Sequence, residues 1–301
     1  MTLYTQAASN IRKTWLFMTL FLVFVIFLGW IFSYLFNEQW ILFIAVALAI
    51  TQSFLSYWNS DKIILSLSQA QGPLQKGDNP ELYRLVENLS ITAGLPMPKV
   101  YIINDVSPNA FATGRDPQHA AICVTSGLLN KLDKVELEGV VSHELSHIGN
   151  RDILLDSVIV VLVGVISLLS NWLIREMAFG GERRREKNDN LEFIFLILGL
   201  LAALFAPLAA TLLQLAISRK REFLADANGA LLTRYPEGLA RALEKIANDP
   251  NPLRTASQAT AHLFIADPLK PKKISWFSNL WQTHPPIEER IKVLREMDGD
   301  K

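Results

Sequence analysis

An uncharged apolar run over residues 14–36 constrains this chain more than any other feature of its sequence. As a helix, the run would be ~34 Å long, slightly more than the ~30 Å hydrocarbon core of a bilayer. A second uncharged run over residues 40–58 follows after a short polar break. The two runs predict a membrane hairpin within residues 1–60. The first run is not expected to be a cleaved signal peptide, because it is too long and lacks a small-residue cleavage site.

Two further apolar blocks, residues 153–174 and 193–217, are also long enough to span a bilayer. They predict a second hydrophobic hairpin over residues 153–217, joined by a charged loop over residues 175–189. We therefore expect about four spans, and the alternative is a second hairpin that does not fully cross. The composition agrees, because a chain that is 50% hydrophobic and 19% charged is too apolar for an ordinary soluble protein.

Basic residues near the span ends predict the orientation in the membrane. Arg12 and Lys13 precede the first span, Lys62 follows the second, and the short connection between them has no basic residue. The amino terminus and the segment 61–152 are therefore expected on the cytoplasmic side. The arginines at 183–185 oppose this orientation if both later blocks cross the bilayer. A formal net charge of zero argues against a nucleic-acid partner.

The segments 61–152 and 218–301 have the patterns of a soluble α+β domain. Short β-rich stretches bounded by turn residues predict a small mixed sheet, and apolar residues at helical spacing predict helices. The expected strands are residues 100–105, 110–114 and 120–125, and the expected helices are residues 79–94, 134–150, 237–248 and 286–297.

The helix expected over residues 134–150 carries His143, Glu144 and His147 in an HExxH motif. The two histidines lie ~40° apart on one helix face, so both imidazoles can bind one metal ion. Glu144 lies further round the helix and can reach a water molecule without binding the metal itself. The motif predicts a zinc hydrolase, and the alternative is a row of polar positions on a surface helix.

A catalytic zinc ion normally has three protein ligands, so a third ligand is needed. Glu222 is the leading candidate because it lies four residues before Asp226 on a polar stripe. Asp226 would then support a ligand histidine from behind. The alternative is a solvated acidic helix face among basic residues. Other candidate ligands are His119, His262 and His284.

The apolar blocks also fix the depth of this site. His147 precedes the third block by ~9 Å of helix, and Glu222 follows the fourth by ~8 Å. The two side chains can meet only on the same side of the bilayer, which requires an even number of crossings between them. We therefore expect the site to face the cytoplasm beside the membrane surface.

Four stretches, PNAFATG, HELSH, SRKREFLAD and THPPIEERI, follow one another in the sequence. In this order they resemble the HtpX-type membrane zinc metallopeptidases, relatives of the CAAX prenyl endopeptidases. The resemblance implies a cytosolic zincin-like domain of a multi-pass endopeptidase in a bacterial cytoplasmic (inner) membrane. Its polypeptide substrates would be misfolded or damaged membrane proteins. It also implies one Zn²⁺ per chain, bound by His143, His147 and Glu222, with Glu144 as the catalytic base.

The resemblance gives roles to further residues. Asn109, Ala110 and Phe111 look like the family's substrate-binding edge strand, to which an extended peptide would add. His284 matches the histidine of the family's HPP motif and would donate to the oxyanion of the intermediate. Arg290 matches the arginine that follows it and would belong to the substrate-binding residues. From the residues alone, a structural role for His284 at the start of the last helix is the alternative.

Two other functions stay open at this point. A membrane scaffold or sensor with a structural metal would need a closed site of four protein ligands, often cysteines, but Cys123 is the only cysteine. A narrow processing protease for lipidated tails, similar to the CAAX endopeptidases, would need a large chamber built from more than four spans.

Overall fold

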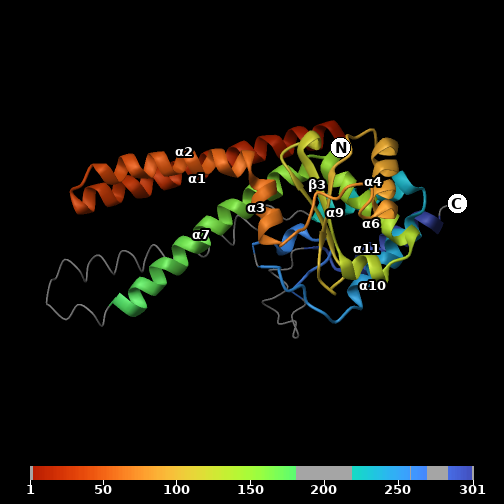
Figure 1. Cartoon of the computed structure of the whole chain (residues 1–301). Helices are drawn as coiled ribbons and strands as arrows, with labels where there is room; N and C mark the ends of the chain where they lie inside the picture. Colours follow the sequence, from red (N-terminus) through yellow and green to blue (C-terminus); the bar gives the residue numbers. More distant parts are fainter. Residues whose placement is uncertain (1–2, 181–218, 258, 270–283, 300–301) are drawn as a thin grey trace.

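Three long helices project from one side of a smaller α+β domain (Figure 1). The computed structural model describes residues 3–180, 219–257, 259–269 and 284–299. Within these residues the chain is mainly helical and contains one three-stranded mixed sheet, in agreement with the expected class. The fourth apolar block and most of the charged loop before it lie outside the described residues.

Helices α1 (Leu3–Phe36) and α2 (Trp40–Trp58) form the expected apolar hairpin. Residues 7–34 of α1 and the whole of α2 are long and apolar enough to cross a membrane, with mean hydropathies of 2.5 and 1.8. Trp30 and Phe43, 55% and 64% exposed, are typical of their large outward side chains. Apolar surface of this extent is normally covered by lipid or by a partner. Helix α1 begins well before the expected span, and its first turns lie against the α+β domain.

The third apolar block forms part of α7 (Asp152–Gly180), one continuous helix. The first part of the expected charged loop, up to Gly180, is therefore helical. The reason is local, since residues 175–179 contain no glycine or proline to end the helix. The packing of α1 against α7 uses apolar side chains of both helices, among them Phe17, Phe21, Val158 and Leu162.

The sheet has the strand order β1-β3-β2. Strand β1 (Lys99–Ile103) runs parallel to β3 (Ala120–Thr125), and β2 (Ala110–Gly114) runs antiparallel to β3. The three strands closely match the expected ranges. Strand β2 lies at the edge of the sheet, and every one of its side chains is buried because α6 and α7 both pack against it.

Helix α6 (Lys134–Gly149) runs through the centre of the domain and carries the HExxH motif. It begins with a capping box, in which the Asp133 side chain accepts from the Glu136 amide and the Glu136 side chain accepts from the Asp133 amide, both at 2.9 Å. Helices α9 (Arg219–Thr233) and α10 (Pro236–Ala247) pack on α6, and α11 (Ile287–Gly299) packs on α10. The expected helix over residues 134–150 is thereby confirmed.

The other described helices are short or lie at the periphery. Helix α4 (Pro80–Ala93) has the expected N-cap, since the Asn79 side chain accepts from the Leu82 amide at 3.1 Å, and it ends at Gly94 with φ of 67°. Two short helices had no sequence signal because they are too short to show a period. They are α3 (Ser60–Leu67) and α5 (Ser126–Lys131), and the two 3₁₀ turns are η1 (Pro117–His119) and η2 (Ala261–Leu263).

Gly139 marks a close approach of α6 and α10. A Cβ at this position would lie 2.7 Å from the backbone nitrogen of Leu239 and 2.8 Å from its Cα. Because backbone cannot yield as a flexible side chain does, Gly139→Ala is expected to lower the free energy of unfolding by ~1–3 kcal/mol. Thermal unfolding in detergent measures the effect. Gly77→Ala is the matched control, since nothing lies within 4 Å of its added Cβ. Equal stability of the two variants would contradict the close packing.

Candidate metal centre and active site

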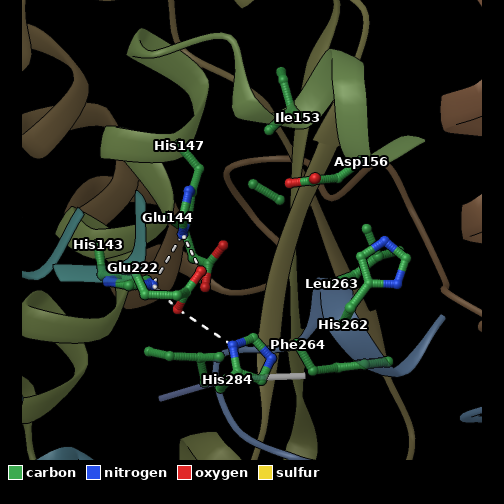
Figure 2. Close-up of a pocket in the computed structure, with 12 residues that line it drawn as sticks. His143, Glu144, His147, Ile153, Asp156, Glu222, His262, Leu263, Phe264 and His284 are labelled. Atoms are coloured by element: carbon green, nitrogen blue, oxygen red, sulfur yellow. Dashed lines mark hydrogen bonds and ion pairs between the residues drawn. The ribbon is translucent and has the colours of Figure 1, made fainter. Parts of the chain in front are cut away.

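Helices α6 and α9 bring His143, His147 and Glu222 together (Figure 2). The Nε2 atoms of the two histidines are 3.1 Å apart. Glu222 reaches them from α9, with Oε2 3.9 Å from Nε2 of His143 and Oε1 3.6 Å from Nε2 of His147. Tetrahedral zinc with nitrogen and oxygen ligands separates its ligand atoms by roughly 3.3 Å. The spacing of these three side chains therefore fits a zinc ion.

An aspartate lies behind each histidine, on the side away from the other ring. Nδ1 of His143 is 2.9 Å from Oδ1 of Asp226, and Nδ1 of His147 is 2.9 Å from Oδ2 of Asp152. A proton on each Nδ1 would face a carboxylate and leave a lone pair on each Nε2. Two lone pairs 3.1 Å apart repel one another unless a metal ion or a proton lies between them. The donor set thus independently fits a bound metal ion.

The carboxylates make the centre strongly attractive to positive charge. Burial by itself would raise the pKa of Glu222, but the neighbouring His284, His147 and Arg290 outweigh it and hold that pKa well below its usual value. Burial lowers the pKa of His147, yet its hydrogen bond to Asp152 and the charge of Glu222 raise it to about 10. The buried centre therefore favours cations and keeps the Glu222 carboxylate ionised.

Asp226 is held by a buried arginine from α11. Arg290 has no exposed surface and donates to both oxygens of Asp226, at 2.8 and 2.7 Å, and to the carbonyl of Ile265 at 2.8 Å. Burial would raise the pKa of Asp226, but the guanidinium outweighs it and holds the pKa at about 2. The sequence-predicted Asp226 and Arg290 thus form one buried pair behind His143.

Glu144 lies beside the three potential ligands in the same pocket (Figure 2). The residue is 1% exposed, and its Oε1 has no hydrogen-bond partner among the described residues. Burial raises the pKa of Glu144 to about 7. A carboxyl group with such a pKa can both take and return a proton. The cavity lined by these residues has a volume of about 20 Å³, which suffices for a water molecule.

The three other histidines differ in position. His284 lines the pocket with Nδ1 3.3 Å from Oε2 of Glu222, and His262 lines the same pocket from η2 (Figure 2). His119 instead pairs with Asp116 at 2.7 Å on the surface near η1. Of the three side chains considered as alternative ligands, the structure therefore brings two into the pocket and leaves His119 outside it.

The expected edge strand borders the pocket, although part of it is already paired. The carbonyl of Ala110 accepts from the Ile265 amide at 2.9 Å, and the Asn109 side chain donates to the Ala266 carbonyl at 3.0 Å. Phe111 points to the opposite face and packs edge-on against Phe264, with ring centroids 5.0 Å apart. The Thr125 amide donates to the Asn109 carbonyl, and the Asn109 amide donates to Oγ1 of Thr125. Because bonded positions alternate in this antiparallel register, Ala112 directs its amide and carbonyl away from β3.

Two buried residues of the centre, Asp152 and Arg221, were not predicted as site residues from the sequence. Asp152 begins α7 directly after the HExxH helix, and Arg221 immediately precedes Glu222. Nη1 of Arg221 lies 3.5 Å from Oδ1 of Asp152, and Nη2 lies 3.2 Å from Oδ1 of Asp156. A usable signal was present, namely a charged residue close in sequence to a ligand and at the edge of an apolar block.

An HExxH helix, an acidic side chain from a second helix and an adjacent edge strand define a metallopeptidase, and the apolar hairpin makes it a membrane-bound one. Comparison with known proteins agrees. A model of peptidase family M48 matches residues 76–298. The chain belongs to peptidase family M48, and it is a metalloprotease.

Its relatives include proteins named protease HtpX homolog. One from Caldanaerobacter subterraneus subsp. tengcongensis is 48% identical over 302 residues, and one from Thermoanaerobacter pseudethanolicus is 47% identical over 301 residues. Each comparison covers 98% of this chain and 98% of the relative. The crystal structure of S. mikatae Ste24p is similar in fold, with a TM-score of 0.52 at 21% identity over 94% of this chain and 67% of that one.

Proposed function

We propose that this protease is a zinc endopeptidase that hydrolyses peptide bonds of misfolded or damaged membrane proteins on the cytosolic side of a bacterial inner membrane. The observation that carries the proposal is the position of Glu144, buried beside three potential zinc ligands and next to the edge strand. One Zn²⁺ per chain would be held by His143, His147 and Glu222. When bound, it would polarise a water molecule and the scissile carbonyl.

Glu144 is the proposed general base. Its side chain lines the water-sized cavity, where the carboxylate would accept the proton of the attacking water. The same carboxyl group would then return the proton to the leaving amine. His284, whose Nε2 has no partner among the described residues, is proposed to donate a hydrogen bond to the oxyanion.

A substrate would bind as an added strand at Ala112. The outward amide of Ala112 faces the Glu144 carboxyl group and hydrogen-bonds to it, and its outward carbonyl is the group left for a substrate amide, whereas the outward carbonyl of Ala110 is already paired with Ile265. We therefore place the scissile segment at Ala112 and assign Asn109 the task of holding the segment around Ala266. The burial of Arg290 favours support of Asp226 over direct contact with a substrate.

Cleavage of matched substrates would test the proposal. A destabilised variant of a membrane protein is expected to be cut in detergent, its folded parent is expected to resist, and a chelator should stop cleavage until zinc is returned. Cleavage of a lipidated peptide alone would replace the proposal by a narrow processing protease. Stoichiometric zinc without cleavage of either substrate would replace it by a metal-binding scaffold.

Four spans and a cytosolic active site are part of the same proposal. The only cysteine, Cys123, is buried, so single introduced cysteines can report on sidedness with little background. With an impermeant maleimide and intact cells, Glu38→Cys, between α1 and α2, and Arg184→Cys are expected to be labelled. Lys76→Cys, on the α+β domain, should react only after lysis. Labelling of Lys76→Cys in intact cells would reverse the orientation, and protection of Arg184→Cys would remove the second pair of crossings.

A further inference from the structure

One polar side chain near the start of the first membrane helix, Asn10, is buried beside the metal centre. Asn10 is 0% exposed, although the rest of α1 is dominated by apolar side chains. Its Nδ2 donates to Oδ1 of Asp152 at 2.6 Å and to the carbonyl of Asn150 at 3.0 Å. Both acceptors lie at the junction of α6 and α7, directly after the HExxH helix. A side chain of the membrane hairpin therefore reaches the chain segment that supports His147.

The α6–α7 junction is shaped so that Asp152 turns back toward His147. Arg151 adopts a left-handed backbone with φ of 59°, which breaks the helix between Gly149 and Asp152. The break places the Asp152 carboxylate, 1% exposed, beside a histidine only five residues earlier. In a continuous helix residues 147 and 152 would lie about 140° apart around the axis, so the carboxylate would point away from the ring nitrogen.

The two carboxylate oxygens of Asp152 contact different partners. Oδ2 is 2.9 Å from Nδ1 of His147. Oδ1 accepts from Asn10 at 2.6 Å, and Nη1 of Arg221 is more distant at 3.5 Å. With Oδ1 fixed by Asn10, the carboxylate plane is fixed too, and Oδ2 faces the imidazole. The ring is then held with Nε2 directed toward Nε2 of His143.

The equivalent support of His143 is arranged differently. There, Asp226 is held at both oxygens by Arg290, entirely within the α+β domain. Asp152 has no such bidentate arginine, and its shortest contact comes from Asn10 in the membrane hairpin. Thr14, one turn further along α1, is also buried, but its hydroxyl donates only to the Asn10 carbonyl at 2.9 Å. Asn10 and Thr14 therefore share the same helix face and burial, while only Asn10 contacts Asp152.

We propose that Asn10 is a positioning residue of the metal centre, through which the first membrane helix orients His147 by way of Asp152. The inference rests on the proposed zinc site. Loss of a group that orients a metal ligand typically weakens metal binding by about 10- to 100-fold. The packing of α1 on the α+β domain thus contributes to the affinity for zinc, in addition to the role of α1 as a membrane anchor.

The test measures the zinc dissociation constant of the full-length protein in detergent by competition with a chromophoric chelator. Asn10→Leu keeps the size of the side chain and removes the donor, and Asn10→Ala is a second variant in case one fails to fold. Both are expected to weaken zinc binding by about 10-fold, and Asp152→Asn by about 10- to 100-fold. Thr14→Val and the exposed Arg12→Ala are matched controls on α1 and should bind zinc as the wild type does. Thermal unfolding of the metal-free proteins monitors general damage to the fold.

A double variant and cobalt spectra distinguish positioning from packing. If Asn10 acts through Asp152, Asn10→Leu combined with Asp152→Asn is expected to bind zinc no more weakly than Asp152→Asn alone. The visible spectrum of bound Co²⁺ should change in Asn10→Leu and stay unchanged in Thr14→Val. Unchanged zinc affinity of Asn10→Leu, equal losses in Asn10→Leu and Thr14→Val, or fully additive effects would overturn the inference. Wild-type protein that binds no stoichiometric zinc would instead overturn the proposed function.

Discussion

Replacing Glu144 by glutamine is expected to lower kcat/KM for peptide hydrolysis by ~10²–10⁴-fold, the usual contribution of a general base. Glutamine has nearly the same size and can still hydrogen-bond, but it cannot accept the proton of the attacking water. Because Glu144 is not among the three side chains grouped around the potential metal position, zinc content should remain at one per chain. The measurement pairs a cleavage assay with metal analysis of the same preparation.

Glu138→Gln is the matched control for this substitution. Glu138 lies on the same helix with a partly exposed side chain, and it forms a 4.0 Å ion pair with the more exposed Lys134. Its replacement is expected to leave both cleavage and zinc content unchanged. Substantial cleavage by Glu144→Gln would remove Glu144 from the role of base and move the assignment to another pocket group such as His284.

Replacing Glu222 by alanine is expected to release the metal. Zinc sites with four protein ligands bind with about 10–16 kcal/mol, or roughly 3 kcal/mol per ligand, so the loss of one ligand should weaken binding by about 100-fold. The substitution also removes the carboxylate that faces His284 at 3.3 Å and Arg290 at 3.4 Å. We therefore expect loss of zinc and of proteolysis together, measured by chelator competition and cleavage.

Lys220→Ala serves as the control on the same turn of α9, where the side chain is exposed. It should retain both zinc and activity, which separates loss of a ligand from a general disturbance of the helix. Retention of wild-type zinc affinity by Glu222→Ala would exclude Glu222 from the ligands, and the pocket histidines His262 and His284 would become the remaining candidates for the third position.

Features that act within one element were predictable. The hairpin followed from two uncharged runs, the ends of α4 followed from Asn79 and Gly94, and the strands followed from β-rich stretches between turns. The pairing of His143 with His147 on one helix face needed only the helical period. In each case the determining interactions lie within a few residues, so the local sequence contains the whole signal.

Features that depend on distant segments were not predictable to the same degree. The short helices α3 and α5 depend on packing against other parts of the domain. The pairing of the edge strand with Ile265 joins residues that are far apart in the chain, and no periodicity marks it. The resemblance placed Arg290 near substrate, whereas its pairing with Asp226 depends on how α11 docks on α9.

The sequence by itself determined a membrane hairpin, an HExxH helix and a short set of candidates for the third ligand, because length, charge and helical period are local properties. Only the tertiary structure decided which acidic residue lies beside both histidines and which groups contact their other ring nitrogens. The support of His147 joins Asn10 to Asp152 across 142 residues, and that of His143 joins Asp226 to Arg290 across 64. Such contacts exist only after helices far apart in the chain have packed together and excluded water from the charges between them.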